Sequence, residues 1–555
     1  MTHVLTDHPV AAADAKSTRS IWWWLNPVAV AAVSAAALHL VIHFFRSANA
    51  ETLPDGYRVQ DWPSNWMMQT LGLEDMVPFG PMAFWYSHVY PPLQDMIRYV
   101  FTFPETGSGR EISAEAVDMR LYVLYAICFG LVNAILYIWV RSLTKSGWWA
   151  LGVTAVWAVH PGYITVMTLL ESSPLAMLTI SLTLLFLYLF LRYRNLGYAT
   201  GFFAALLLAS LARTVTQTHV LAVVLLALVA FWFIAAKRTW WQMAMNILLV
   251  SLLFVMPIRM QVLYATWDVT SYGGYHRAGP LWIDPRTVPQ PVPESVMEQY
   301  EVYELARAKA EDPVQLAQMT PDEIRQAQAE FAQAEAVWQQ QSAAYPNVDF
   351  STARSYPDRI EQNALKFSSR FNTREQVLDN FRLGAAANEF LFSQPLESAQ
   401  RLSRSLAITV PEAFRPASEY TQNYLVEDLP WRGVWDWLFS SWRYVLLIAG
   451  AAAVIIWTRG WRGTRRLLVK YGWFAAFYGL LALPIMFSNR FRPGEEEIGP
   501  MWTDAIRQKV FLEIPLWALG GYALWLLLSR RGRLSWPKAR RRTPEAETPS
   551  ERLPA

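Results

Sequence analysis

The sequence is poor in cysteine, histidine and charge. Its 555 residues include one cysteine, Cys128, and eight histidines, and Asp, Glu, Lys and Arg together make up only 17%. A single cysteine excludes an intrachain disulfide and a metal site built from several thiolates. A Walker sequence, a dinucleotide-binding glycine pattern, an HExxH motif and a nucleophile elbow are all missing. These absences point away from chemistry on soluble nucleotides and towards substrates carried by lipids.

Apolar residues are abundant and are gathered into long runs. They make up 53% of the chain, which includes 27 tryptophans, and the runs 221–236 and 239–258 contain no charged residue. A helix needs about 20 apolar residues to cross a hydrocarbon core about 30 Å thick. The backbone must satisfy its own hydrogen bonds there, so such runs are helices. The sequence therefore predicts an all-α polytopic membrane protein.

We predict ten transmembrane helices, at 23–45, 121–140, 148–167, 174–191, 199–212, 218–236, 240–260, 435–457, 467–487 and 510–528. Basic residues gather in every second connection, for example Arg192 with Arg194, Lys237 with Arg238, and Arg465 with Arg466. Basic connections stay in the cytoplasm. With ten spans both termini are then cytoplasmic, and this layout favours a bacterial inner membrane.

The spans divide the chain into five parts. We expect a cytoplasmic tail at 1–22, a membrane core at 23–260 with a long first outer loop at 46–120, a periplasmic and mostly helical insertion at 261–434, three C-terminal spans at 435–529 and a basic cytoplasmic tail at 530–555. Within the insertion, Asp312-Pro313 ends one helix, and Thr320 with Glu323 forms the capping pattern that begins another. A helical hairpin follows from this. It fits both a lid over the outer loop and a surface for an acceptor or partner protein.

Several short motifs occur in a set order along the first seven spans. Asp61-Trp62-Pro63 stands 30 residues ahead of Pro91 in Tyr90-Pro91-Pro92-Leu93, and later come His160-Pro161, Leu170-Glu171-Ser172-Ser173, Arg213-Thr214, Pro257-Ile258-Arg259 and Ser271-Tyr272-Gly273-Gly274. In this order they resemble the GT-C superfamily of integral membrane glycosyltransferases. That class includes protein O-mannosyltransferases, aminoarabinose transferase and Rgt-type galacturonosyltransferases. The likeness is weaker where the second carboxylate of the outer-loop motif is replaced by Trp62, and it ends before the insertion.

The resemblance implies transfer of a monosaccharide from a polyprenyl-phosphate donor to a lipid, glycan or protein acceptor on the outer side. Such a reaction needs a base for the acceptor hydroxyl and cations for the departing phosphate. Asp61 matches the position of the base, although a solvated loop aspartate is the plainer interpretation. The other candidates for the base are Asp95, which follows the Pro-Pro-Leu motif, and then Asp55, Glu74 and Asp75.

The phosphate candidates are Arg213, Arg259 and Arg507, which stand at the outer ends of predicted spans. An ionisable residue at that depth is costly unless it is paired or faces a cavity, but arginines near span ends also reach the interface by snorkelling. Glu171, His88 and Tyr90 are placed in the substrate site. Glu171 would bind acceptor hydroxyls or a cation, although a capping or interfacial carboxylate explains it as well. His88 would contact the donor phosphate, although a satisfied loop histidine is the plainer interpretation, and Tyr90 is included through its motif. Arg98 is equally well explained as an interfacial anchor.

Nothing in the sequence requires a cofactor, and a divalent cation is compatible with the reaction without being demanded by it. His39 and His43 share a helix face, but an interfacial pair explains them better than a metal site. We expect lipids as partners and no nucleic acid. Two other classes stay open. One is a non-catalytic scaffold of an envelope glycan assembly complex. The other is a secondary transporter, which would show an internal repeat and broken helices with charges at the midplane. The sequence shows neither.

Overall fold

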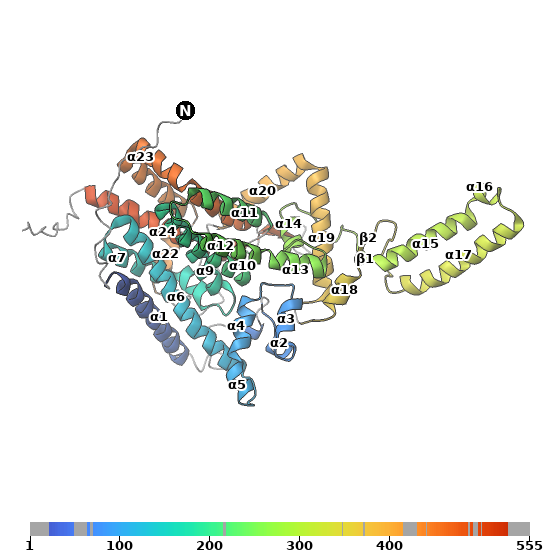
Figure 1. Cartoon of the computed structure of the whole chain (residues 1–555), viewed down its shortest axis with the longest axis horizontal. Coiled ribbons are helices and arrows are strands. Elements are labelled where there is room, and N and C mark those ends of the chain that lie inside the picture. The colour runs from blue at the N-terminus through green and yellow to red at the C-terminus, as the bar shows by residue number, and fades with distance from the viewer. Residues whose placement is uncertain are drawn as a thin grey trace, which may run out of the picture.

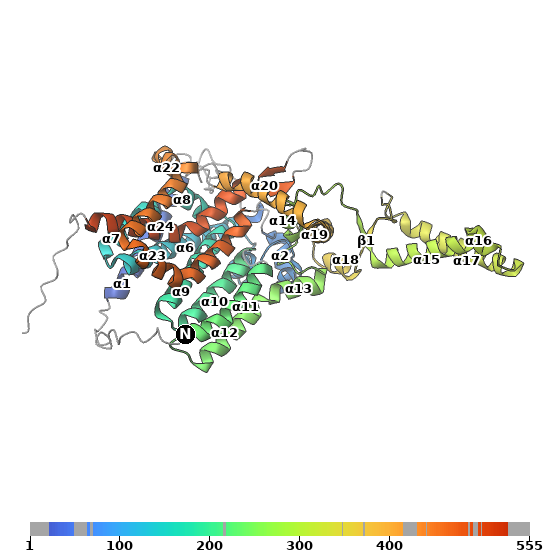
Figure 2. The same cartoon turned by 90° about the horizontal axis from the view of Figure 1, so that it is seen from above.

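The computed structural model describes residues 22–48, 64–66, 70–214, 218–346, 348–369, 372–413, 430–439, 441–486, 489–491, 498–500 and 502–530. The described chain is almost entirely helical, as expected. A bundle of long helices forms one body, and a helical arm projects from it (Figure 1, Figure 2).

The long helices of the body follow the apolar runs of the sequence. Their bounds are α1 Trp22–Ala48, α6 Ala114–Thr144, α7 Gly147–Ala158, α8 Pro161–Thr168, α9 Ser173–Tyr193, α10 Leu196–Ala212, α11 Thr218–Ile234, α12 Trp240–Leu253, α13 Val255–Tyr264, α23 Ser441–Met486 and α24 Trp502–Arg530. Polar residues begin several of them. The side chains of Ser146, Asn195 and Thr239 accept hydrogen bonds from the first turns of α7, α10 and α12, and such caps satisfy amide groups that a helix start leaves unpaired.

Six helices of the described chain are long and apolar enough to cross a membrane, and a seventh span is formed if the bent pair α7 and α8 counts as one. By helix length and hydropathy the chain is a multi-pass membrane protein. Helices cover all ten predicted stretches, but α10 and the apolar part of α11 are shorter than a full span. Most of the predicted eighth span and nearly all of the ninth lie within one helix, α23, whose backbone is non-helical at Gly460 and at Tyr471.

The pair α7 and α8 departs from the sequence analysis, which found no broken helix. The two helices meet at an angle of 68°. Pro161 begins α8, and the side chain of His160 accepts a hydrogen bond from the amide of Tyr163. Proline has no amide hydrogen to donate to the preceding turn, and it disfavours a helical conformation at the residue before it, so the step from His160 to Pro161 favours a break here.

The described part of the first outer loop contains several short helices. They are η1 Ser64–Trp66, α2 Leu73–Phe79, α3 Pro81–Tyr86, α4 Leu93–Phe101 and α5 Phe103–Gly107. Prolines stand at the starts of α3 and α5, and Pro92 directly precedes α4. The described part of this loop lies beside the ends of the long helices (Figure 1), and α4 packs against both α6 and α10.

The insertion has two parts with different surroundings. One part packs on the body and contains α14 Gly273–Ala278, α18 Arg359–Ala364, α19 Arg374–Ser393 and α20 Pro395–Ala413. The other part is the arm, made of α15 Glu294–Glu311, α16 Pro313–Leu316 and α17 Pro321–Ser342. The arm leaves the body through a parallel pair of short strands, β1 Pro291–Pro293 and β2 Arg354–Tyr356. The predicted capping box of Thr320 and Glu323 is confirmed, as is the helix end before Pro313.

The C-terminal region adds one helix that the sequence analysis merged with a span. Helix α22, Arg432–Phe439, precedes α23, and residue 440 between them lies outside the described residues. An antiparallel pair of strands, β3 Asn489–Phe491 and β4 Ile498–Pro500, connects α23 to α24.

Candidate functional site

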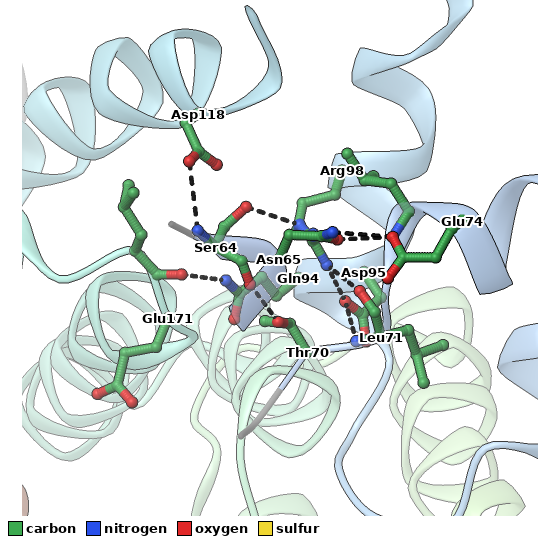
Figure 3. A network of polar contacts seen from close by, with 12 residues as sticks. Ser64, Asn65, Thr70, Leu71, Glu74, Gln94, Asp95, Arg98, Asp118 and Glu171 are labelled. Carbon is green, nitrogen blue, oxygen red and sulfur yellow. Dashed lines mark hydrogen bonds and ion pairs between the residues drawn. The ribbon is translucent and has the colours of Figure 1, made fainter. Parts of the chain in front are cut away.

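One guanidinium organises the described part of the first outer loop. Arg98, on α4, is fully buried. It donates hydrogen bonds to the carbonyl of Leu71 at 2.6 Å, to Oγ of Ser64 at 3.2 Å and to Oδ1 of Asn65 at 3.1 Å (Figure 3). It also forms a 3.0 Å ion pair with Asp95. Arg98 therefore holds residues 64–71 against α4, and the interpretation of Arg98 as an interfacial anchor is wrong.

Asp95 completes this arrangement from the same helix. Its Oδ1 accepts from Arg98 and, at 3.2 Å, from the backbone amide of Leu71. Burial raises the pKa of Asp95 to about 6, although the charge and hydrogen bond of Arg98 act in the opposite direction. The carboxylate is thus ionised at neutral pH and fixed in place by two donors.

Two further contacts fasten the loop to the membrane helices. The amide of Ser64 donates to Oδ2 of Asp118, near the start of α6, at 3.3 Å. Nε2 of Gln94 donates to the carbonyl of Leu170, at the turn between α8 and α9, at 2.9 Å. Oε1 of Gln94 is buried and has no hydrogen-bond partner among the described residues. Two hydrogen bonds, between residues 54 and 76 positions apart in the sequence, therefore join the loop to α6 and to the turn between α8 and α9.

Glu171 and Arg213 meet beneath this loop. Glu171 is 1% exposed and Arg213 is 8% exposed, and their charged groups lie 3.8 Å apart. Ser173 joins them, because its hydroxyl donates to Glu171 and accepts from Arg213 at 2.9 Å. The guanidinium of Arg213 also lies over the ring of Phe511, on α24, at 5.5 Å. Figure 3 shows the carboxylate of Glu171 turned away from the Arg98 network, so the two polar groups are neighbours without being one network.

Arg259 lies at the junction of α13 and the outer loop. It is 4% exposed, and its NH1 donates to the carbonyl of Phe84, at the end of α3, at 2.8 Å. The hydroxyl of Tyr264 donates to the carbonyl of Tyr86 in the same way at 2.6 Å. Nε of Arg259 has no hydrogen-bond partner among the described residues, and no ion pair joins this guanidinium to a described carboxylate. Arg259 is therefore a buried cation whose charge the described protein does not balance.

His88 lies in the same place and is fully buried. Nδ1 of His88 is 2.9 Å from Oγ of Ser271, its amide donates to Oδ1 of Asn372 at 2.8 Å, and its ring meets Tyr264 edge to face. Nε2 of His88 has no hydrogen-bond partner within the described chain. Burial lowers the pKa of His88 to about 3, and the positive charge of Arg259 contributes in the same direction. His88 is therefore neutral at physiological pH.

The body-packed part of the insertion covers this region. Phe367 packs edge to face on Phe79 with ring centres 5.3 Å apart, and Nζ of Lys366 lies 5.2 Å from the ring centre of Tyr86. Tyr90 is half-buried, with its ring 5.3 Å from that of Tyr272. Together with the Asn372 contact, these interactions place Lys366, Phe367 and Asn372 on the first outer loop, while the arm extends away from it (Figure 2).

A second buried polar group surrounds the break between α7 and α8. His160 is packed among the rings of Trp157, Trp435 and Trp517, with ring centres 4.8 to 6.1 Å away. On α24, Nζ of Lys509 and Oε1 of Glu513 lie 3.7 Å apart, and Oε2 of Glu513 lies 3.9 Å from Nε2 of His160. Charges inside a membrane helix are costly and usually functional. Glu513 was not among the residues that the sequence singled out.

The predicted residues thus separate into groups. Asp95 lies in the Arg98 network, Glu171 and Arg213 form a pair, and His88 lies with Arg259. Asp61 and its rival Asp55 lie outside the described residues, and Arg507 lies on α24 with a side chain outside the described part. Asp118 and the structural role of Arg98 were not predicted. The spacing of Asp95 and Arg98 could have indicated their ion pair, since residues three apart share a helix face.

No group of three or more His, Cys, Asp or Glu side chains within the described chain could hold a metal ion. Compared with models of protein families, with curated proteins and with solved structures, the sequence and the fold give no significant match.

Proposed function

We propose that the chain is a GT-C-type glycosyltransferase that moves a monosaccharide from a polyprenyl-phosphate donor to a lipid, glycan or protein acceptor on the outer side of a bacterial inner membrane. The observation that carries this proposal is Arg259, a buried guanidinium with no described carboxylate partner, beside the buried and unpartnered Nε2 of His88. An uncompensated charge at that depth is expensive unless it has an anionic ligand. The phosphate of a lipid-linked donor would supply such an anion.

The chemistry of the two groups suits a phosphate ester. A guanidinium presents planar donors that match phosphate oxygens. A neutral imidazole whose Nδ1 accepts from the hydroxyl of Ser271 carries its proton on Nε2, and it donates from there without adding charge. The 2.9 Å contact between His88 and Ser271 allows this tautomer. Arg259 would then hold the departing phosphate, and His88 would orient it.

Asp61 is the proposed general base. It stands three residues before Ser64, which Asp118 and Arg98 hold in place. In the reaction, the acceptor oxygen forms a bond with the anomeric carbon as the bond between that carbon and the phosphate oxygen breaks. The acceptor proton goes to the carboxylate, and the polyprenyl phosphate leaves with its electron pair. Asp95 is the rival base, but its contacts with Arg98 and Leu71 favour a positioning role.

The carrier chain also needs an apolar path beside the bundle. A groove of about 920 Å³ runs between α1 and the α6 to α8 region, and residues such as Val33, Leu38 and Leu151 line it. It extends to Val159, next to the break before α8. An isoprenoid chain in this groove would gain burial along its length.

The topology that the proposal requires has ten spans. At 1.5 Å per residue, the 46 residues of α23 would extend about 69 Å, more than twice the hydrocarbon thickness. Gly460 has φ 68° and ψ 164°, which interrupts the helix near its middle. Two spans with a basic connection around Gly460 fit these dimensions. With α7 and α8 as one broken span and with α10 and α11 as short spans, the total is ten.

One observation favours a second candidate function, a secondary transporter. Transporters place buried charges at broken helices, and His160, Glu513 and Lys509 surround the break between α7 and α8. Uptake of a solute driven by a proton gradient in proteoliposomes would support this candidate, and the transferase assay below would then show no product.

The deciding experiment is transfer from a panel of radiolabelled polyprenyl-phosphate sugars by the purified chain in proteoliposomes, together with a separate measurement of donor binding. We expect Arg259→Gln to lose donor binding by at least tenfold, and Asp61→Asn to keep donor binding while losing turnover. The matched control is Arg382→Gln, because Arg382 is also buried, at 8% exposed, but has a carboxylate partner in Asp379. If sugar transfer persists in Asp61→Asn, the general base would be Asp95 instead. Donor binding that survives in Arg259→Gln, or the absence of transfer from any donor, would refute the proposal.

A further inference from the structure

A cavity of about 710 Å³ at the opposite, basic end of the bundle is lined by five cationic side chains: Arg194, Arg462, Arg465, Arg466 and Lys470. Arg194 ends α9 and has a left-handed backbone, and its carbonyl accepts from the amide of Ala236 at 2.8 Å. The other four cations belong to α23, which packs against α9. Two helices far apart in the sequence therefore bring positive charges into the same cavity.

The cations of α23 share one helix face. Residues 462, 465, 466, 469, 470 and 473 all line the cavity, and separations of three and four residues place side chains on the same side of a helix. The stacked rings of Tyr188 and Tyr471, 5.7 Å apart, hold α23 against α9 at this level. The packing of α23 on α9 thus brings these cations together, and the positive-inside rule alone does not require such a cluster.

The protein supplies no counter-charge for this cavity in the segments that form it. Residues 172–267 and 437–494 contain no Asp or Glu. Within the described chain, none of the five cations forms an ion pair with a carboxylate. Five like charges around one hollow repel each other, so an anion that enters the hollow lowers their energy.

The surroundings indicate where that anion comes from. Val469 and Trp473 line the same cavity and are 79% and 37% exposed, and Trp457 and Trp461 near Gly460 are more than 60% exposed. Exposed tryptophans mark the level of lipid headgroups. A molecule that lies here has a phosphate among cations and an apolar part against valine and tryptophan. Basic pockets between membrane helices on the cytoplasmic side bind anionic headgroups in this way.

We propose that this cavity is a binding site for the phosphate headgroup of an anionic membrane lipid. The inference concerns the side of the membrane opposite the candidate transferase site, and it stands whether or not the proposed function holds.

The test uses full-length protein purified in detergent, with the retention of added lipid measured by native mass spectrometry and by titration. The probes are cardiolipin, phosphatidylglycerol and phosphatidylcholine. We expect the wild type to retain both anionic lipids and to lose phosphatidylcholine. The double variant Arg465→Gln with Lys470→Gln should bind the anionic lipids on the order of 30-fold more weakly, because each cation near such a headgroup contributes about a factor of five. Arg465→Lys should retain binding within about threefold.

The matched control removes one arginine and one lysine from the same side, by Arg141→Gln with Lys145→Gln, because neither residue lines the cavity. Unchanged lipid binding in the control and unchanged thermal unfolding in both double variants support the site. An equal loss of lipid binding in the control variant would show that overall surface charge causes the effect, and it would overturn the proposal. Equal retention of phosphatidylcholine would also overturn it, as would displacement of lipid by millimolar inorganic phosphate or nucleotide, which would indicate a soluble ligand.

Discussion

Arg98 and Asp95 lie one turn apart on α4, and a 3.0 Å ion pair joins them in an environment where the Arg98 side chain has no exposure and the Asp95 side chain only 7%. The same guanidinium binds Leu71, Ser64 and Asn65. The fold of the outer loop before α4 therefore depends on one buried cation, and residue 61 enters that loop three positions before the first of these contacts.

Replacing Arg98 by glutamine should lower the free energy of unfolding by about 3–5 kcal/mol, because the change leaves Asp95 buried without its partner. Thermal unfolding in detergent, followed by tryptophan fluorescence, measures this change. Arg120→Gln is the control, because its ion pair with Glu105 is partly exposed and should contribute at most about 1 kcal/mol. Adding Asp95→Asn to Arg98→Gln should restore part of the stability. Equal melting temperatures for Arg98→Gln and Arg120→Gln would contradict the proposed role.

The buried His88 should make the protein less stable in mild acid. Its pKa is about 3 in the folded chain and about 6.5 when unfolded, so the unfolded state takes up a proton first as the pH falls. The stability that the neutral His88 contributes is therefore fully present above pH 6.5, and it is lost progressively as the pH falls to about 3. It amounts to about 2 kcal/mol between pH 8 and pH 5.

The measurement for His88 is the melting temperature from pH 8 to pH 5 for the wild type and for His88→Asn. The variant should lose less stability over this range, because its side chain does not titrate. His39→Asn provides a control histidine on α1 outside this site. Parallel pH profiles for the wild type and His88→Asn would show that the imidazole is protonated in the folded protein.

Helix α1 should be sensitive to one added methyl group on α6. A Cβ at Gly130 would lie 2.2 Å from the carbonyl oxygen of Ala31, so Gly130→Ala must push the two helices apart. We expect a loss of about 1–3 kcal/mol. Gly152→Ala, on α7, meets no atom within 4 Å and should be neutral or stabilising by up to about 1 kcal/mol. Thermal unfolding distinguishes them, and similar melting temperatures would rule out the close contact between α1 and α6.

The connection around Gly460 should face the opposite side of the membrane from the arm. Single cysteines at Arg462 and at Gln318, in a Cys128→Ala background, would be labelled in intact and in permeabilised cells with an impermeant maleimide. We expect Gln318→Cys to react in intact cells and Arg462→Cys only after permeabilisation. Cys128 itself is buried, so its removal serves mainly to lower background. Labelling of both positions in intact cells would exclude two spans within α23.

The sequence by itself determined that the protein is helical and crosses the membrane several times, and it determined the ends of two helices in the arm. Apolar runs specify where helices lie in a bilayer, because hydropathy and backbone hydrogen bonding act over about 20 neighbouring residues. The capping box at Thr320 and the helix end before Pro313 depend on only four residues or fewer, and both were predicted correctly.

Only the tertiary structure decided which charged residues meet. The contact between His88 and Asn372 joins residues 284 positions apart, and Asp118 binds a loop 54 positions before it. The pairing of Glu171 with Arg213 and the convergence of Arg194 with the α23 cations likewise follow from how separate helices pack. No local pattern encodes such contacts, because a side chain's partner depends on where the whole bundle places it.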